Sequence, residues 1–512
     1  MLTFFSITLF ITIFSSFILE RWVKPEPLEH LSLKVIVLQS SLVGIVFLML
    51  SLIIQRAIFS GLAIFVFLII LLAVNNAKYK ALNEPMVFSD FAMFSQAFKH
   101  PRLYFPFLGL LPVILAPIFI IGLIITVLTL EPALALTWQR VFSSLIIIIS
   151  LFFISKQIAL SMSLSSTPEG DIKRYGLLSS LYLYTIHALS HSHKKQISET
   201  LKNAPFSSNS LQKQYPPPLF SPVFLEKKPN ITVIQSESFF DARRLHPSIK
   251  TELLKSFDKV CTESIQYGQL KVPAWGANTM RTEFSFLTGI KNNAMGFFRF
   301  YPYQFLAKLP VSSVASALKS QGYYCVCIHP HPASFFGREH LFPLFGFDEF
   351  IDIDSFSNAH KFGPYISDQS VTDKIIKISQ EKTNKPLFIF AITMENHGPL
   401  HLEKTTIEEQ ESFYTGKVLE NSNDLTVYLR HLKNADKMLK QLTEFYLKSK
   451  TAHTLCFYGD HIPSMPDIYQ QTEFTNHHSD YLIWTNDKSG KNQQQQQRIM
   501  PVENLASRLF HI

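Results

Sequence analysis

The sequence predicts an α/β protein in two parts: an N-terminal bundle of five transmembrane helices and a C-terminal α/β domain with a largely parallel central sheet. Two observations lead to this fold class. Uncharged apolar runs crowd the first third of a chain of 512 residues, of which 47% are hydrophobic and 17% are charged. After Phe220, strand-like apolar runs alternate with amphipathic helical patterns, which is typical of a doubly wound sheet.

Five apolar runs are expected to span a membrane: 1–19, 35–55, 57–77, 103–130 and 141–155. A span needs roughly 20 apolar residues, and the last run reaches that length if Lys156 snorkels to the interface. The first run lacks the basic start and the cleavage site of a secretory signal peptide, so we interpret it as an uncleaved span. The alternative, buried helices of a large soluble core, is disfavoured by the length of the runs.

The domain boundaries follow from these runs. Residues 1–165 are assigned to the transmembrane domain, 166–220 to a juxtamembrane helix and Pro-rich linker, and 221–512 to the α/β domain. The linker is expected to be stiff at Pro216–Pro218. Four cysteines are too few for a disulfide scaffold and are interpreted as buried free thiols.

Within the α/β domain, apolar runs predict strands at Ile231–Gln235, Tyr323–Ile328, Leu387–Thr393, His453–Tyr458 and Tyr481–Trp484. Amphipathic patterns predict helices at Glu252–Ser264, Thr282–Thr288, Val314–Gln321, Val371–Glu381 and Leu425–Lys448. In such sheets, functional residues collect at the carboxyl ends of the strands. Polar motifs follow several of these strands directly.

Three of these motifs offer groups for a cation and a nucleophile. Glu237 follows the first strand, and Asp460 with His461 follows a later one; carboxylate oxygens and imidazole are suitable ligands for a divalent cation. Thr279 lies where a loop enters a helix, and a cation beside its hydroxyl would favour the alkoxide, a nucleophile. Taken singly, Glu237 is better explained as a solvated loop glutamate and Thr279 as a helix N-cap, whereas a polar turn is the weaker explanation of Asp460 and His461.

Two further motifs carry groups suited to phosphate. His397 follows a strand and could protonate a leaving oxygen or bind a phosphoryl oxygen. His329 and His331 lead into Phe336 and Arg338, whose guanidinium offers a bidentate fork for phosphate. A core histidine and a surface arginine are the ordinary explanations of each residue alone, so the hypothesis depends on their joint placement.

At these residues the chain resembles the lipoteichoic acid synthase and phosphoglycerol transferase family of the alkaline phosphatase/sulfatase superfamily. The matching elements occur in family order: Glu237-Ser238-Phe239, Thr279-x-x-Thr282-Glu283-Phe284, Leu287-Thr288-Gly289, Ser334-Phe335-Phe336-Gly337-Arg338, Asn396-His397-x-Pro399 and Gly459-Asp460-His461. The preceding apolar spans fit the family layout as well. The resemblance implies a sulfatase-like fold for the α/β domain.

The resemblance also implies roles for individual residues. Thr279 and His397 would be catalytic, and one divalent cation, manganese or else magnesium or zinc, would be held by Glu237, Thr279, Asp460 and His461. Substrate contacts would come from His329, His331, Phe336, Arg338 and His397. The family favours Trp and Asp where this chain has Phe336 and His331, which leaves the donor headgroup open.

The function expected from the resemblance is transfer of glycerol phosphate from phosphatidylglycerol to an envelope glycan or polysaccharide, through a phosphothreonine. A phosphoethanolamine transferase is the nearest alternative, and a non-catalytic membrane receptor or transporter with a degenerate domain is an alternative of another class. A true sulfatase is disfavoured because the chain has no Cys/Ser-x-Pro-x-Arg run. The net charge of +8 suits anionic lipid headgroups, and no nucleic-acid-binding motif accompanies it.

The expected location is a bacterial inner membrane, crossed several times, with the α/β domain on the periplasmic or extracellular side. Charge alone predicts the reverse, since this orientation leaves Arg56 and Arg140 as the basic residues of the inner loops. The outer loops would hold seven basic residues: Arg21, Lys24, Lys34, Lys78, Lys80, Lys99 and Arg102. We keep the outward orientation because the expected acceptors are envelope glycans and basic outer loops could steer anionic headgroups.

Overall fold

The structure is a computed structural model. It describes residues 2–28, 30–93, 110–165, 167–207, 210, 228–306, 311–381, 384–416, 418–487 and 496–510. Two compact units make up the chain, Met1–Lys194 and Lys195–Ile512. The Pro-rich linker expected at Pro216–Pro218 lies outside the described residues.

The first unit is built from long apolar helices: α1 (Leu2–Glu20), α2 (Leu33–Ile54), α3 (Ala57–Leu82), α5 (Leu110–Leu130) and α6 (Trp138–Leu160). Among the described residues, α1, α2, α3 and α6 are long and apolar enough to cross a membrane. The expected span at 103–130 falls partly on 103–109, which lie outside the described residues. Large apolar side chains such as Phe10, Ile53 and Phe153 are exposed on these helices, as lipid contact requires.

Two buried carboxylates fix helix starts in this unit. Glu20 accepts hydrogen bonds from the backbone N–H groups of Leu177 and Leu178, at distances of 2.8 and 2.9 Å, where α8 (Leu177–Ala188) begins. Glu131 accepts bonds from two amides in the first turn of α3 in the same way. A carboxylate stabilises a helix N-terminus because the first amides have no partner within the helix. The unit also contains α7 (Pro168–Tyr175), and α9 (His191–Lys202) follows α8.

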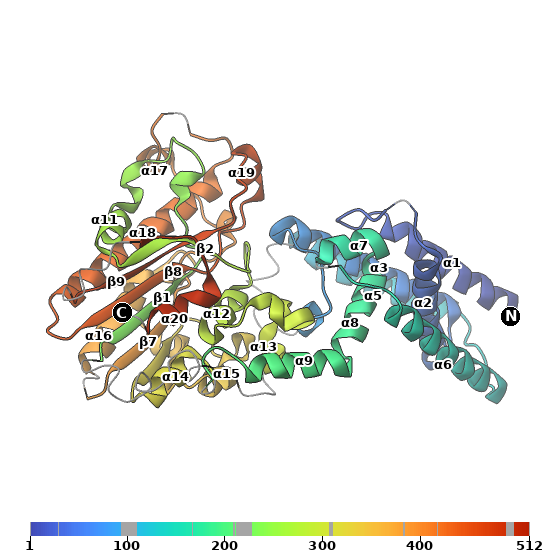
Figure 1. The fold of residues 1–512 in the computed structure, drawn as a ribbon. Coiled ribbons are helices and arrows are strands. Elements are labelled where there is room, and N and C mark those ends of the chain that lie inside the picture. Colours follow the sequence, from blue (N-terminus) through green and yellow to red (C-terminus); the bar gives the residue numbers. More distant parts are fainter. Residues whose placement is uncertain are drawn as a thin grey trace. The chain divides into compact units, whose positions relative to one another are not determined.

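The second unit contains a nine-stranded sheet in the order β10-β2-β9-β8-β1-β7-β3-β4, with β11 also paired to β2. The strands are β1 (Asn230–Ser236), β2 (Gln266–Lys271), β3 (Tyr324–Ile328), β4 (Glu349–Ile351), β7 (Leu387–Ile392), β8 (His453–Gly459), β9 (Ser479–Thr485), β10 (Gln496–Gln497) and β11 (Met500–Pro501). β8, β1, β7, β3 and β4 are parallel, whereas β9 runs antiparallel to β8 and β2. In Figure 1 the green β1 lies among orange and red strands from much later in the chain.

Helices cover both faces of this sheet. α11 (Lys255–Glu263), α16 (Asp368–Glu381) and α18 (Asn423–Leu447) share a buried core with the alternate residues Ile389 and Ala391 of β7. On the opposite face, Phe286 of α12 (Thr279–Thr288) stacks on Phe390 and Tyr458. The remaining helices of four or more residues are α13 (Pro302–Leu306), α14 (Val314–Ser320), α15 (Arg338–Leu344), α17 (Ile407–Phe413), α19 (Pro466–Gln471) and α20 (Leu505–Arg508), with 3-10 turns Thr251–Leu254, Asn292–Phe300 and Ile353–Phe356.

The predicted fold class is confirmed: apolar membrane helices precede an α/β domain with a largely parallel central sheet. All four cysteines are buried and free, in line with the interpretation as thiols. Because β8, β1 and β7 are adjacent and parallel, their carboxyl ends meet at one edge of the sheet.

Candidate active site

The end of β1 delivers Glu237 into the protein interior. Ser238 adopts a left-handed backbone conformation with φ +54°, so the chain turns sharply after the strand. Tyr428 of α18 donates a hydrogen bond to the Ser238 carbonyl at 2.7 Å. The Glu237 amide donates to Thr393 Oγ1, 3.0 Å away at the end of β7. The backbone at Glu237 and Ser238 is therefore fixed by two neighbouring elements.

The end of β8 approaches the backbone after β1 so closely that only glycine fits. A Cβ atom at Gly459 would lie 1.8 Å from the Phe239 carbonyl oxygen. Asp460 follows, and its Oδ1 accepts hydrogen bonds from the amides of Ser238 and His461, at 2.8 and 2.9 Å. Its Oδ2 is buried and has no hydrogen-bond partner within the part of the chain that the structure describes. One carboxylate oxygen thus orients Asp460 while the other is available to a ligand.

Thr279 is the first residue of α12, and Asn278 before it has φ +69°. Two contacts tie this helix start to the turn after β8. Thr282 donates to the Asp460 carbonyl at 2.7 Å, and the Gly276 amide donates to the Ile462 carbonyl at 3.0 Å. As a result, Thr279 Oγ1 lies 3.5 Å from His461 Nε2.

Glu237, Asp460 and His461 form one buried cluster whose ligand atoms all lie within 4.8 Å of one another. His461 Nδ1 is 3.0 Å from the Ile462 carbonyl, which can only accept, so Nδ1 carries the proton and Nε2 presents a lone pair. Nε2 lies 3.4 Å from Asp460 Oδ2 and 3.6 Å from Glu237 Oε1. The structure therefore brings together the four side chains that the sequence analysis grouped around a cation.

The electrostatics of this cluster suit a cation. Burial, and then the negative charge of Asp460, raises the pKa of Glu237 to about 8. Two buried carboxylates this close repel each other, and a positive ion between them would remove that cost. Two carboxylate oxygens and one imidazole nitrogen match the ligand preferences of manganese, zinc and related divalent metals. The donor set and the unpaired Asp460 Oδ2 thus fit a divalent cation.

Arg338 lies in a second buried cluster with a partner that the sequence analysis did not assign. Its Nε and Nη2 donate to the two oxygens of Glu283 on α12, at 3.0 and 2.9 Å. Both residues are almost fully buried. The bidentate fork expected to bind phosphate is therefore engaged by Glu283, which leaves Nη1 as the guanidinium nitrogen not bonded to that carboxylate.

His329 and Phe336, which the sequence analysis expects to contact substrate, touch Arg338, and His331 lies beside His329. His329 accepts from Arg338 Nη1 at 3.2 Å, and its Nδ1 donates to the Ile392 carbonyl at 3.3 Å. Burial, and then the charge of Arg338, lowers the pKa of His329 well below its usual value, so the ring is neutral. The Phe336 ring lies 5.1 Å from the guanidinium carbon, and the His331 ring packs against Phe335 at 4.8 Å. These contacts hold Arg338 in place.

His397 follows β7, next to the end of β1. Its Nδ1 lies 2.6 Å from the Gly398 carbonyl and so carries the proton, leaving Nε2 as the ring atom that can exchange a proton with a substrate. Tyr365 contacts the same ring edge, with its hydroxyl 3.3 Å from Nδ1. Burial lowers the pKa of His397, and therefore the ring is neutral at pH 7.

A comparison of the sequence with known protein families gives independent support for this site. The sulfatase family model matches residues 229–512, which is more than half of the chain and contains every residue of both clusters. The chain belongs to the sulfatase family. The expected membership of the alkaline phosphatase/sulfatase superfamily is therefore confirmed.

Relatives of this sulfatase-family protein share different portions of it. Capsular polysaccharide biosynthesis protein RkpI of Rhizobium meliloti is 26% identical over 446 residues, which cover 84% of this chain and 77% of RkpI. A putative cyclic beta-1,2-glucan modification protein of the same organism is 31% identical over 251 residues, 48% of this chain but only 38% of the relative. The integral membrane protein EptA, a lipooligosaccharide phosphoethanolamine transferase from Neisseria meningitidis, has a similar fold, with a TM-score of 0.55 at 10% identity over 98% of this chain and 94% of EptA. The similarity in fold to this membrane protein thus extends over the apolar helices as well as the α/β domain.

Three residues of the sulfatase-family domain have contacts that sequence reasoning did not assign. Glu283 binds Arg338, Thr282 binds the Asp460 carbonyl, and Ser238 donates to Glu237 Oε1 at 2.9 Å. All three belong to the motifs that carry the family resemblance. Their place in those motifs was the signal that could have marked them as functional. Their contacts could not be predicted, because the partners are distant in sequence or the contact depends on backbone conformation.

Proposed function

We propose that this chain is a membrane-bound phosphoglycerol transferase that moves glycerol phosphate from phosphatidylglycerol to an envelope glycan or polysaccharide. The observation that supports the proposal most is the 3.5 Å separation between Thr279 Oγ1 and His461 Nε2, beside the carboxylates of Glu237 and Asp460. A hydroxyl at the start of a buried helix, next to such a ligand set, is suited to act as a nucleophile.

Glu237, Asp460, His461 and Thr279 would hold one divalent cation, manganese first and magnesium or zinc as alternatives. When bound, such an ion supplies Lewis acidity, which favours the alkoxide of the threonine and offsets charge on phosphoryl oxygens. The protein contributes fixed orientation: the amides that bind Asp460 Oδ1 and the carbonyl that binds His461 Nδ1 determine which ligand atoms face Thr279.

The transfer takes two displacement steps. In the first, a bond forms between Thr279 Oγ1 and phosphorus while the bond from phosphorus to the diacylglycerol oxygen breaks; Thr279 loses a proton and diacylglycerol gains one. In the second, an acceptor hydroxyl attacks the phosphothreonine, loses its proton and restores the Thr279 hydroxyl. His397 Nε2 is proposed to exchange the proton with the oxygen that leaves or enters. The N-terminus of α12 favours the negative charge that develops there.

The names of two relatives support a glycan acceptor. RkpI is named for capsular polysaccharide biosynthesis, and the second relative for modification of a cyclic glucan. Envelope glycans lie outside the cytoplasm, so the catalytic domain is proposed to face the periplasm of a bacterial inner membrane. His331, Phe336 and Arg338 are proposed to contact the donor headgroup. Glu283 binds Nε and Nη2 of Arg338, and Nη1 donates one hydrogen bond to His329, so the second Nη1–H is the donor proposed to reach the headgroup.

The test is substitution of the nucleophile in the full chain. Thr279→Ala should reduce turnover by about a thousandfold or more because the attacking oxygen is lost, while the protein still binds metal through Glu237, Asp460 and His461. Thr279→Ser is the matched control, since it keeps a hydroxyl at the same position, and should retain measurable turnover. Full activity in Thr279→Ala would refute the assignment.

The identity of the donor is decided by mass spectrometry of the protein after incubation with donor lipid and no acceptor. Phosphoglycerol on Thr279 supports the proposal, whereas phosphoethanolamine on the same residue assigns the chain to the alternative transferase class. A wild-type chain that binds no metal and forms no adduct with either lipid would favour the non-catalytic receptor or transporter.

A further inference from the structure

A hairpin of two short strands, β5 (Lys361–Phe362) and β6 (Tyr365–Ile366), lies outside the main sheet of the α/β domain. The strands are antiparallel, and Phe362 is directly opposite Tyr365. Side chains of directly opposite residues lie on the same face of an antiparallel pair, so these two rings share one face of the hairpin. A two-stranded hairpin is only marginally stable by itself, and its position therefore depends on what this face contacts.

Tyr365 contacts the ring of His397, the residue proposed to exchange protons with the substrate. Its hydroxyl donates a hydrogen bond to the Gly398 carbonyl at 3.1 Å and lies 3.3 Å from His397 Nδ1. The two rings meet edge to face, with centroids 5.4 Å apart and planes at 64°. Gly398 belongs to the same loop as His397 and moves with it, whereas Tyr365 comes from a separate element. Tyr365 therefore ties the imidazole to an element outside its own loop.

Phe362, on the same face, fixes the hairpin to α18. Its ring meets the His431 ring edge-on, with centroids 5.3 Å apart and planes at 89°. The guanidinium carbon of Arg430 lies 5.9 Å from the centre of the Phe362 ring, within the range of a cation–π contact. Both partners belong to α18, a helix of 25 residues whose buried face is part of the domain core. The hairpin is thus anchored to a long packed helix.

Glu403 connects α18 to the turn of this hairpin. Its Oε1 lies 2.9 Å from His431 Nε2. A Cβ atom at Gly363, between the two strands, would lie 2.6 Å from the same oxygen, so the turn packs directly on this carboxylate. His431 Nδ1 lies 3.1 Å from Glu395, two residues before His397. One helix thus holds both the hairpin and the loop that carries His397.

The Nδ1 edge of His397 is occupied by these contacts. Nδ1 donates to the Gly398 carbonyl at 2.6 Å, and the Tyr365 hydroxyl lies against the same edge. Nε2 is therefore the nitrogen that can meet a substrate oxygen. Proton transfer needs a hydrogen-bond distance of about 2.6–3.2 Å, and a misplacement of about 1 Å can cost about a hundredfold in rate. Fixing the ring therefore contributes a measurable factor to turnover.

We propose that Tyr365 is a positioning residue for His397, and that the hairpin β5–β6 transfers the fixed position of α18 to the imidazole. The inference rests on the proposed function, since it concerns the proton exchange assigned to His397 Nε2. Tyr365 forms no covalent bond and keeps its proton, which it donates to the Gly398 carbonyl. Its contribution acts entirely through His397.

A double-mutant cycle on the full-length chain in detergent tests the proposal. The assay is release of diacylglycerol from phosphatidylglycerol in mixed micelles, or from phosphatidylethanolamine if that is the lipid turned over. Tyr365→Ala should lower kcat about tenfold or more and leave KM within about twofold, because the substrate contacts remain. His397→Ala should lower kcat about a hundredfold or more.

The combined variant decides between positioning and an independent role. In Tyr365→Ala/His397→Ala the loss of kcat should equal that of His397→Ala alone, because without the imidazole Tyr365 has nothing to position. Losses that multiply would overturn the proposal. Every variant should bind Mn²⁺ with wild-type affinity, which shows that the domain is folded and the cation cluster is intact.

Matched tyrosine variants separate this role from a general loss of packing. Tyr365→Phe keeps the ring contact and loses the hydroxyl, so its kcat should lie between those of the wild type and Tyr365→Ala. Tyr324→Phe removes another half-buried hydroxyl, which is 3.0 Å from Glu349, and should leave kcat unchanged. Equal losses in Tyr365→Phe and Tyr324→Phe would contradict a specific role.

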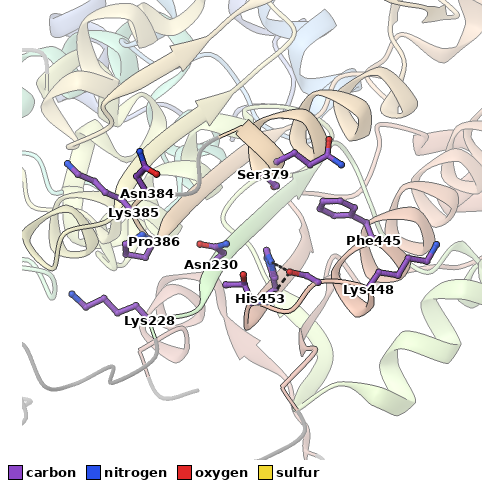
Figure 2. Close-up of a pocket in the computed structure, with 12 residues that line it drawn as sticks. Lys228, Asn230, Ser379, Asn384, Lys385, Pro386, Phe445, Lys448 and His453 are labelled. Carbon is purple, nitrogen blue, oxygen red and sulfur yellow. Dashed lines mark hydrogen bonds between the residues drawn. The ribbon is translucent and has the colours of Figure 1, made fainter.

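The anchor on α18 is tested with Phe362→Ala. This variant should lower kcat about three- to tenfold through a looser hairpin, and should have no further effect in the His397→Ala background. Phe445→Ala removes another half-buried ring, on the wall of a cavity of about 720 Å³ at the amino ends of β1, β7 and β8 (Figure 2). It should leave kcat unchanged, since the candidate active site lies at the opposite ends of these strands.

A readout without turnover separates failure of this inference from failure of the proposed function. The Nδ1–H signal of His397 in a chain with isotope-labelled histidine is assigned by NMR through comparison with His397→Gln. It should exchange with solvent about tenfold or more faster in Tyr365→Ala, because the tyrosine covers that edge. Unchanged exchange in an active enzyme would overturn the inference alone. A wild-type chain that turns over neither lipid would overturn the proposed function, and a Tyr365-dependent exchange rate would then report a contact without a catalytic role.

Discussion

At the scale of single residues, the motif around Thr279 divides its tasks along one helix. Thr279 presents its hydroxyl to His461, Thr282 binds the turn after β8, and Glu283 binds Arg338. Every residue of α12 is buried, which leaves no position free for a solvent contact. Three residues near the start of this helix therefore each have a separate partner, and these partners determine their spacing.

Gly459 has no room for a side chain. A Cβ atom there would meet the Phe239 carbonyl oxygen at 1.8 Å, so β8 or the turn after β1 must move. Gly459→Ala should lower the free energy of unfolding by about 3 kcal/mol or more, through strain in a packed interior. Metal affinity should fall with it, because Asp460 is adjacent. Thermal unfolding and metal titration in detergent measure both effects.

The control for this substitution is Gly122→Ala in α5, where nothing lies within 4 Å of the added atom. That variant should unfold like the wild type. Wild-type stability and metal affinity in Gly459→Ala would show that the approach of β8 to β1 is looser than the structure indicates.

The Arg338–Glu283 pair gives a prediction that separates a structural from a substrate-binding role. Arg338→Met leaves the Glu283 carboxylate buried without its partner, which should cost about 3–5 kcal/mol of unfolding free energy. The double variant Arg338→Met/Glu283→Gln removes both charges and should recover most of that loss. Denaturant titrations of the two variants make the comparison.

The exposed pair Lys440–Glu444, 3.8 Å apart on α18, is the matched surface case. Lys440→Met should cost less than about 1 kcal/mol, as exposed ion pairs contribute little. A cost for Arg338→Met as small as this would mean that Arg338 is not held by a buried partner, and its fork would again be available for phosphate.

At the scale of elements, the central strands and long helices could be predicted because their patterns are strong. The expected run His453–Tyr458 lies inside β8, and Leu425–Lys448 overlaps almost all of α18. Among the described strands of three or more residues, two were not predicted: β2, whose sequence Gln-Tyr-Gly-Gln-Leu-Lys is mostly polar, and β4, which has three residues. The two-residue strands, β10 and β11 among them, were not predicted either. A short or polar strand gains its partners from tertiary structure, so it needs no continuous apolar run.

The candidate site, like the strands and helices, could be predicted only where the local sequence pattern is strong. Strand ends indicated Glu237, Asp460 and His461, because a polar residue after a buried strand is conspicuous. The helix expected at Thr282–Thr288 begins three residues earlier, at Thr279 itself, after Asn278 in a left-handed conformation. Nothing in the local sequence shows that Glu283 faces Arg338, since that pair depends on how α12 packs across the sheet.

His431 of α18 links this helix to the loop after β7 and makes stability depend on pH. Its Nδ1 lies 3.1 Å from Glu395 and its Nε2 2.9 Å from Glu403. Burial alone would lower the pKa of His431, but the two carboxylates outweigh it and raise the pKa to about 9. Since the unfolded pKa is about 6.5, this contribution is complete below about pH 6.5 and is lost as pH rises through about 9.

The free energy of unfolding should therefore fall by up to about 3 kcal/mol between pH 6.5 and pH 9. Urea titrations across this range measure it. His431→Gln should remove most of this pH dependence, whereas His340→Gln, at an exposed position of α15, should keep it. An unchanged pH profile in His431→Gln would place the dependence on another group.

At the scale of the whole molecule, the loop charges bear on orientation. Lys78 is paired with Glu84 and Asp90, each at 2.8 Å, which reduces the basic excess of the loops that are proposed to lie outside. Arg56 and Arg140, at the opposite helix ends, donate to backbone carbonyls at 2.8 and 2.6 Å. The ion pairs of Lys78 thus weaken the simple count of basic residues from which the reverse topology follows, whereas Arg56 and Arg140 keep their full charge.

A reporter fused after Ile512 tests the orientation directly. An alkaline phosphatase reporter, active only outside the cytoplasm, should be active there, and a fluorescent reporter that matures in the cytoplasm should stay dark. A second fusion of each reporter in the short loop at Gln55 should give the opposite pattern and serves as the control. A dark phosphatase with a bright fluorescent fusion at the end of the chain would reverse the proposed location.

The order of the central strands has a consequence for how the protein is made. β8, which carries Asp460 and His461, forms the neighbour of β1 although more than two hundred residues separate them in the chain. A growing polypeptide that has already released Thr279 therefore still lacks Asp460 and His461, two of the three side chains proposed to activate it. Under the proposed mechanism, Thr279 becomes reactive only when synthesis has passed His461, so an incomplete chain emerging at the membrane would be harmless to the lipids around it.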